Sequence, residues 1–199
     1  MSKKDAQKKA LQIAVQALEG VDFTSRADLL KLPFEVTDKG FRIRMFGKNV
    51  IVSDNYSMIY EKDMSEIKVD EALLLLHFLQ TENPVAKKDE LISFRQLPGG
   101  MFYWEPFLSR TVRPMLKCLN GNIEKIKSNI NRFDWVQKDF GDFSAEINAF
   151  ANLNVTLILY FEDDEFPPSA DVLFDASVKQ LLPTEDVAVL AGKICFGLL

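Results

Sequence analysis

The sequence predicts an α+β fold, a single domain with a central, mostly antiparallel sheet, a buried helix and a C-terminal amphipathic helix. Residues 34–60 alternate apolar and polar side chains around turn residues, which is typical of a β-meander. Residues 69–81 are apolar almost all round, which indicates a buried helix. Residues 184–199 repeat apolar side chains at helical spacing directly after a proline, which predicts the C-terminal helix.

Length and composition favour one globular domain that is able to bury a sizeable core. The chain has 199 residues, of which 47% are hydrophobic and 27% charged, and a net charge of −5. This acidic balance argues against a nucleic-acid-binding surface. Cys118 and Cys195 form no metal-binding motif, and no secretory signal or membrane-length apolar run is present. We therefore expect a cytoplasmic protein with no nucleic-acid partner and no membrane partner.

The N-terminal part, residues 1–20, is predicted to be an amphipathic helix over residues 4–19. Leu11, Ala14 and Leu18 recur at helical spacing, and Gly20 ends the helix. The lysines near the start of this helix are expected to face solvent.

Residues 34–60 are predicted to form a small antiparallel meander. The segment FRIRMF, 41–46, alternates apolar and basic residues, and Gly47-Lys48-Asn49 turns the chain into the apolar run VIVS. A short strand at 34–37 and another near Tyr56 would complete it.

Residues 69–132 are predicted to be mostly helical. The buried helix at 69–81 has acids in its first turn, which suits the helix dipole. A second helix begins at Pro106 and runs toward Leu119, and Pro114 predicts either a kink or two short helices. A third helix is expected over residues 122–132.

Residues 144–175 are predicted to hold the central strands and an acidic turn. The run NVTLILYF, 154–161, is apolar on both faces and β-branched, so it is the best candidate for a central strand, with 144–150 as its neighbour. In the final helix Pro183 and Thr184 supply a stop and an N-cap, and a stripe faces the core. That stripe consists of Val187, Leu190, Ala191 and Ile194.

The stretch SFRQLPGGMFYWEPF, residues 93–107, is an aromatic–glycine loop that could bind a planar anionic ligand. Aromatic faces would stack on such a ligand, while arginine and amide groups would hold its charge. The candidate contacts are Arg95, Gly99, Gly100, Tyr103 and Trp104. The alternative is a tight turn whose aromatics cover the core.

His77 is the lone histidine, and it lies within the apolar run LLLLHFL. It is either a neutral, buried side chain with a hydrogen-bonding partner, or an axial ligand or general base in an apolar pocket.

The acidic run FEDDEFPPSADVLFD, 161–175, follows the predicted central strand, where ligands often bind in parallel sheets. Asp163, Asp164 and Glu165 could hold a hard cation such as Mg²⁺ or Ca²⁺ through carboxylate oxygens. A solvated turn and a docking patch for a partner are the alternatives, since charge runs are usually exposed.

Four segments in order carry a resemblance to a known family. They are LLLHFL, SFRQLPGG, FEDDEFPPSADVLFD and QLLPTED, and they span about residues 70–187. The sequence resembles the bacterial and archaeal family known as domain of unknown function 3786. Members are often fused to a four-cysteine iron–sulfur domain of the kind found in corrinoid/iron–sulfur methyl carriers. This chain has no such segment, so the resemblance implies an anaerobic setting, a corrinoid cofactor, and a separate iron–sulfur or corrinoid protein as partner.

Three functions are compatible with these observations. The first is a non-enzymatic module that binds a cofactor-like ligand or a redox partner through the aromatic–glycine loop. The second is an enzyme that uses carboxylates, with or without a divalent ion, through Asp163, Asp164 and Glu165 with His77 as a base. The third is a structural or assembly protein with a large apolar surface patch and no pocket.

Overall fold

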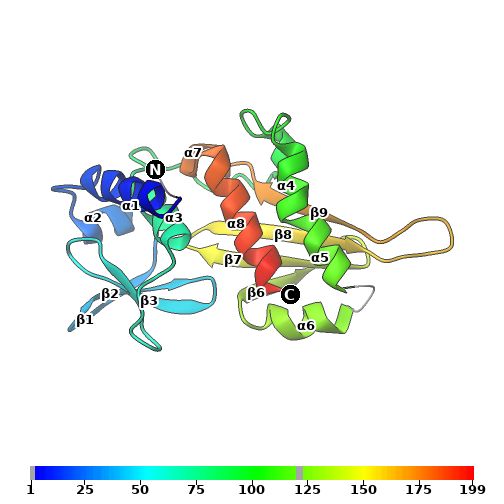
Figure 1. Cartoon of the computed structure of the whole chain (residues 1–199), viewed down its shortest axis with the longest axis horizontal. Helices are drawn as coiled ribbons and strands as arrows, with labels where there is room; N and C mark the ends of the chain where they lie inside the picture. Colours follow the sequence, from blue (N-terminus) through cyan, green and yellow to red (C-terminus); the bar gives the residue numbers. More distant parts are fainter. Residues whose placement is uncertain (1–2, 120–122) are drawn as a thin grey trace.

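The computed structural model describes residues 3–119 and 123–199 and has the predicted α+β fold, built on two antiparallel sheets (Figure 1). Sheet A contains β1 (Phe34–Thr37), β2 (Gly40–Met45), β3 (Lys48–Val52) and β4 (Met58–Tyr60) in that order. Sheet B has the order β5-β9-β8-β7-β6. Its strands are β5 (Leu91–Ser93), β6 (Asp134–Lys138), β7 (Phe143–Phe150), β8 (Leu153–Tyr160) and β9 (Ser169–Asp175).

Sheet A is the predicted meander, and it stands as a sheet of its own beside sheet B. Ile43 pairs with Val50 across β2 and β3, and both side chains are buried because the apolar set of each strand faces the core. Polar contacts join the two sheets beside their shared apolar core. The N–H of Phe46 donates to the carbonyl of Ala149 at 2.6 Å, and Arg44 forms an ion pair with Asp134.

Sheet B confirms the prediction of a central strand. β8 lies in the middle of five strands, and its residues from Val155 to Leu159 are all buried. The edge strands β5 and β6 were not predicted, because β5 has only three residues and three of the five residues of β6 are exposed. All pairings are antiparallel, so the acidic run lies in a β8–β9 hairpin and not at the ligand-binding edge of a parallel sheet.

The helices lie at positions close to those predicted, with three additional short elements. The elements are α1 (Lys3–Gln16), α2 (Phe23–Leu29), α3 (Val69–Leu79), η1 (Phe94–Gln96), α4 (Trp104–Arg110), α5 (Val112–Leu119), α6 (Ile123–Ile130), α7 (Val178–Leu181) and α8 (Thr184–Gly197). The short α2, η1 and α7 show too few turns for a periodic signal. Residue 122, the predicted start of α6, lies outside the described residues.

The helix predicted from Pro106 to Leu119 is two short helices, and the break is at Thr111 rather than at Pro114. Pro114 is the third residue of α5, where its missing N–H costs no helical hydrogen bond. Thr111 has non-helical dihedrals, φ −132° and ψ −85°, and its hydroxyl donates to the carbonyl of Phe107 at 2.7 Å. Pro106 is the third residue of α4, so the helix begins two residues earlier than predicted.

The C-terminal helix α8 confirms its predicted stripe but not its predicted cap. Val187, Leu190, Ala191 and Ile194 are all buried. The N-cap position is held by Pro183, and the hydroxyl of Thr184 donates instead to the carbonyl of Pro98 at 2.9 Å. Thr184 therefore ties the start of α8 to the aromatic–glycine loop.

Helices α4, α5 and α8 cover one face of sheet B, and sheet A with α1 to α3 lies at one end of it (Figure 1). α3 packs between α1 and α8, and one continuous core cluster contains residues from Ala14 to Leu198. Within the described residues, no helix is both long and apolar enough to span a membrane.

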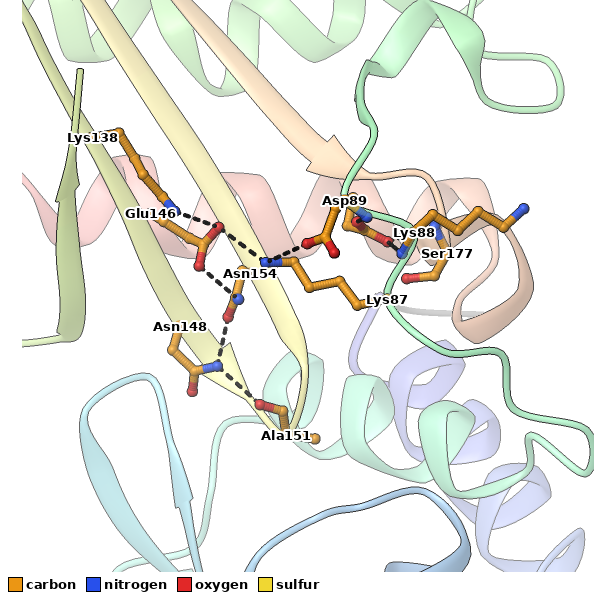
Figure 2. Close-up of polar contacts among 10 residues, drawn as sticks. Lys87, Lys88, Asp89, Lys138, Glu146, Asn148, Ala151, Asn154 and Ser177 are labelled. Carbon is orange, nitrogen blue, oxygen red and sulfur yellow. Dashed lines mark hydrogen bonds and ion pairs between the residues drawn. The ribbon is translucent and has the colours of Figure 1, made fainter. Parts of the chain in front are cut away.

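The other face of sheet B carries a polar network, with α8 behind the sheet in this view (Figure 2). The Glu146 carboxylate lies 3.5 Å from the ammonium groups of both Lys87 and Lys138, and it accepts a hydrogen bond from Asn154. The buried Asp175 carboxylate accepts the backbone N–H groups of Lys88, Asp89 and Ser177. The carboxylates of Asp89, Glu146 and Asp175 are all engaged within the chain, so we assign this network to holding residues 87–89 against the sheet.

Candidate functional site

A groove of about 1700 Å³ lies over the outer side of α8, which forms its floor. Sheet A, through the β2–β3 turn, β4 and the residues after it, forms one wall, and α4 with the end of the aromatic–glycine loop forms the other. The floor and walls mix small, aromatic and charged residues. The floor residues are Thr184, Glu185, Ala188, Val189, Gly192, Lys193, Phe196 and Gly197.

Three glycines lie where the walls meet α8 and one another, and at two of them, Gly47 and Gly197, the approach is too close for a side chain. A Cβ atom at Gly192 would lie 3.7 Å from the carbonyl oxygen of Arg110, and one at Gly197 would lie 2.4 Å from the ring of Phe133. A Cβ atom at Gly47 would lie only 1.8 Å from the carbonyl oxygen of Arg132. These contacts place Arg110 and Arg132 at the same end of the groove, near the last turns of α8.

A hydrogen-bonded ionic cluster occupies the side of the groove between α3, β4 and α8. The buried Glu71 carboxylate accepts from the Tyr60 hydroxyl at 2.7 Å and from the Lys193 ammonium at 3.1 Å. Lys193 also lies 2.7 Å from Asp70. The buried Glu71 carboxylate is thus fully paired, as a charged group away from water requires.

Tyr60 is held as a neutral phenol in this cluster. Burial, together with the hydrogen bond that it donates to Glu71, raises the pKa of Tyr60 well above its usual value. The ammonium of Lys48 lies 4.8 Å from the centre of the Tyr60 ring, a cation–π distance. Tyr60 therefore serves in this cluster as a hydrogen-bond donor to Glu71 at one edge of the groove.

Two arginines of the groove have no partner among the residues that the structure describes. The other five arginines are each engaged. Arg26 donates to the carbonyl of Thr81, Arg42, Arg44 and Arg113 form ion pairs, and Arg95 stacks on Trp104. Arg110 and Arg132 are exposed, and both line the groove. Their guanidinium groups are free to bind a ligand.

The aromatic–glycine loop divides between core and surface. Phe94 and Phe107 are buried and stacked with ring centres 4.2 Å apart, and Trp104 stacks on Phe107. Tyr103 is 55% exposed and lines the groove, whereas Phe102 is 90% exposed at the tip of the loop. Of the predicted contacts, Tyr103 alone reaches the groove.

The other predicted contacts of this loop serve its shape. Arg95 lies 4.3 Å from the centre of the Trp104 ring, and both residues are outside the groove lining. Gly99 has a φ of +73°, and a Cβ atom at Gly100 would lie 2.0 Å from the carbonyl oxygen of Phe94. The two glycines therefore permit a tight turn that other residues would strain.

His77 is half-buried and hydrogen-bonded rather than open to a ligand. Its Nδ1 atom lies 2.5 Å from the Asp186 carboxylate of α8. This hydrogen bond raises the pKa of His77 above its ordinary value, against the effect of burial. The pair joins α3 to α8 behind the groove.

The acidic run lies at the tip of the β8–β9 hairpin, where Glu162 to Glu165 are all exposed. The Asp163 side chain accepts the backbone N–H groups of Glu165 and Phe166 and so closes the turn. No group of three or more potential metal ligands occurs in the described parts of the chain. Figure 1 shows the hairpin tip at the far end of the molecule from sheet A, well apart from the aromatic–glycine loop.

The groove residues were mostly missed at the sequence level, because they come from distant segments. Tyr60, Glu71, Arg132 and Lys193 lie on different elements, and no motif joins them. One signal was available, since Glu71 is an acid at the start of an otherwise apolar helix. It was interpreted only as a favourable charge for the helix dipole.

Comparison with known proteins identifies a family and nothing closer. The model of the family described as domain of unknown function (DUF3786) matches residues 22–196. Neither the curated proteins nor the solved structures include a match to the chain. The matched segment contains all of the groove residues named above apart from Gly197, and on this match the chain belongs to the DUF3786 family.

Proposed function

We propose that the protein is a non-enzymatic binding module that holds a bulky, cofactor-like organic ligand in the groove above α8. The observation that carries this proposal is the groove of about 1700 Å³ with free arginines at one end. Pockets for ordinary small ligands measure roughly 300–1,000 Å³, so the ligand is expected to be larger than a simple metabolite. A structural or assembly protein would need no such cavity.

The groove chemistry supports a ligand with an apolar body and polar edges. Tyr103, Phe107 and Phe196 offer aromatic surface, and the cluster around Glu71 offers hydrogen-bond donors and acceptors. We propose a corrinoid as the first ligand to test, because family resemblance associates such domains with corrinoid proteins in anaerobic metabolism. A corrinoid is a bulky macrocycle with amide edges and a phosphate-bearing tail.

We further propose that the loaded module contacts a separate iron–sulfur or corrinoid protein. The exposed tip of the aromatic–glycine loop, Met101 and Phe102, stands beside the groove wall and supports such a contact. Co-purification of a protein of that kind with the wild type, but not with Phe102→Ser, is the expected result.

The test of ligand binding uses protein purified from an anaerobic host and weighed by native mass spectrometry. A discrete mass above the 22.7 kDa chain is expected, and uptake of hydroxocobalamin is expected to shift its visible absorbance. Gly192→Leu should abolish both, because the new side chain projects into the groove from a helical position with space around it.

Gln7→Leu on the exposed face of α1 is the matched control and should leave binding unchanged. A wild-type protein that carries no added mass and takes up no cobalamin would contradict the proposal. Equal binding by Gly192→Leu would show that the groove is not the site.

A second candidate, an enzyme that uses carboxylates, has one observation in its favour. Glu71, Lys193 and Tyr60 bring an acid, an amine and a phenol together at the groove edge. Glu71→Gln would then abolish turnover of a bound ligand while preserving its binding. A ligand recovered chemically unchanged from the wild type supports the binding module instead.

A further inference from the structure

We infer that the end of the groove near the last turn of α8 is an anion subsite, formed by Arg110, Arg132 and Phe196, that receives a phosphate or carboxylate group of the ligand. This inference rests on the proposed function, since it specifies the charge of the group that enters one end of the same groove. Its ligand chemistry is an oxyanion attached to a flat or apolar body.

The segments that carry the two arginines converge on one short stretch of α8. Arg110 contacts α8 at Gly192, and Phe133, the residue after Arg132, contacts it at Gly197. Five residues of α-helix rise about 7.5 Å, so the Arg110 carbonyl and the Phe133 ring meet α8 within that distance along its axis.

Phe196 lies on the stretch of α8 that these two segments contact. Phe196 is four residues after Gly192 and one before Gly197, so its side chain leaves α8 on the surface between the two arginine segments. Its ring is 55% exposed although it belongs to the groove lining. An exposed phenyl in the same lining as two unpaired arginines offers a stacking surface for the body of a ligand whose charged group the arginines bind.

This end of the groove carries an excess of unpaired positive charge. Arg110 and Arg132 are the two arginines without a partner in the described segments, while the protein as a whole carries a net charge of −5. Two acids of the lining, Asp70 and Glu71, meet α8 at Lys193 and are paired with its ammonium. Glu185, the acid of the lining on α8 itself, is seven residues before Gly192, about 10 Å along the helix. Asp134, two residues after Arg132, is neutralised by Arg44.

The dipole of α8 opposes an anion at this end of the groove, but its effect is smaller than that of the two arginines. The C-terminal end of a helix carries about half a negative charge, which is screened by solvent. Two guanidinium groups supply two full positive charges, and each can donate two parallel hydrogen bonds to an oxyanion. The balance therefore favours anion binding.

The test measures binding of two simple probes by calorimetry at low salt, with pyrophosphate for a phosphate source and citrate for a carboxylate source. Wild-type protein is expected to bind at least one probe with a dissociation constant in the millimolar range or tighter. Arg110→Ala and Arg132→Ala should each weaken binding about tenfold, because each removes charge-assisted hydrogen bonds. The probe that binds more tightly identifies the source of the oxyanion.

Arg113→Ala is the matched control, because Arg113 is an exposed arginine three residues from Arg110 that pairs with Glu105 and lies outside the groove lining. It should change affinity less than twofold. Equal loss in all three variants would mean unspecific attraction, and no binding of either probe by the wild type would also overturn the inference. If Arg110→Ala and Arg132→Ala retain a native ligand as well as the wild type does, the anion subsite is wrong, although the proposed function still holds.

Discussion

Residues of the groove fall into two kinds, those whose polar groups are paired inside the protein and those whose polar groups are left for the proposed ligand. Glu71 belongs to the first kind, because both of its oxygens are used inside the protein by Tyr60 and Lys193. Arg110 and Arg132 belong to the second kind, because no described residue uses their guanidinium groups. The distinction predicts that the first set controls stability and the second controls binding.

Replacement of Glu71 tests the first task. Glu71→Ala should lower the free energy of unfolding by about 3 kcal/mol, because it leaves the mostly buried Lys193 ammonium with a single carboxylate and the Tyr60 hydroxyl without an acceptor. Urea unfolding followed by circular dichroism measures this change. Glu124→Ala on α6 removes an exposed i,i+3 pair with Lys127 and should cost less than about 0.5 kcal/mol. Similar costs for the two variants would contradict the structural role of Glu71.

Gly47 and Gly99 separate the cost of backbone conformation from the cost of close approach. Both have positive φ, +71° and +73°, but a Cβ atom has open space at Gly99 and would lie 1.8 Å from the Arg132 carbonyl at Gly47. Gly99→Ala should cost about 1 kcal/mol, and Gly47→Ala roughly 2 kcal/mol more because the wall of the groove must move. Thermal unfolding of the two variants checks the difference. Equal losses of stability would show that the backbone near Arg132 moves away from the new Cβ atom without a cost in free energy.

Among the elements, α8 contributes both to the core and to the groove, because one of its faces packs on sheet B and the other forms the groove floor. Its buried stripe was visible in the sequence as a helical repeat. Its ties to other elements were not visible. They are the bond from Thr184 to the aromatic–glycine loop, the pair from Asp186 to His77 on α3, and the bridge from Lys193 to Asp70 and Glu71.

The pair of His77 and Asp186 makes the docking of α3 on α8 depend on pH. The hydrogen bond from Asp186 raises the pKa of His77 in the folded state, so the pair stabilises the fold fully below the unfolded pKa of about 6.5. That contribution is lost as the pH rises through the folded pKa. The stability difference between wild type and His77→Gln should therefore be larger at about pH 6 than at about pH 9.

Unfolding in urea at the two pH values measures this dependence. Asp186→Asn should flatten it in the same way, because the carboxylate that raises the pKa is then gone. A stability difference that grows toward high pH would have the wrong sign for this pair.

At the scale of the whole molecule, two sheets share one core. The core cluster includes Ile43 and Val50 of sheet A and Val155 and Leu157 of sheet B, and the groove lies where sheet A meets α8. The ion pair of Arg44 with Asp134 is exposed and adds little to the joint. Shared burial is therefore what keeps the two walls of the groove in register.

A shared core predicts cooperative unfolding of both sheets. The two tryptophans, Trp104 and Trp135, both belong to the sheet B side, so their fluorescence reports that part of the molecule. Phe41→Trp places a reporter in sheet A, where Phe41 stacks on Phe23 at 4.5 Å. In a Phe41→Trp variant with both native tryptophans changed to Phe, the urea midpoint should match that of the wild type measured by circular dichroism. An earlier midpoint for the sheet A reporter would show that the two sheets unfold separately.

Local pattern was enough for much of the fold, and the reason is physical. The meander over residues 34–60, the central strand β8 and the buried stripe of α8 each follow from side-chain period and turn residues within one segment. The break at Thr111 and the edge strands β5 and β6 were missed, because short or exposed elements leave little periodicity. The predicted cap at Thr184 was wrong, because its hydroxyl binds a loop 86 residues away in the sequence.

The sequence by itself determined the α+β class, the main elements and the family, because these depend on local pattern and on the order of short motifs. The tertiary structure alone decided where a ligand could bind. The groups that line the groove come from sheet A, α3, α4, the turn after α6 and α8, and their contact depends on packing between distant segments. It also separated the acidic turn from the aromatic–glycine loop, since an antiparallel hairpin carries its tip away from the core. The spacing of residues along the sequence does not predict the distances between such distant segments in the folded protein.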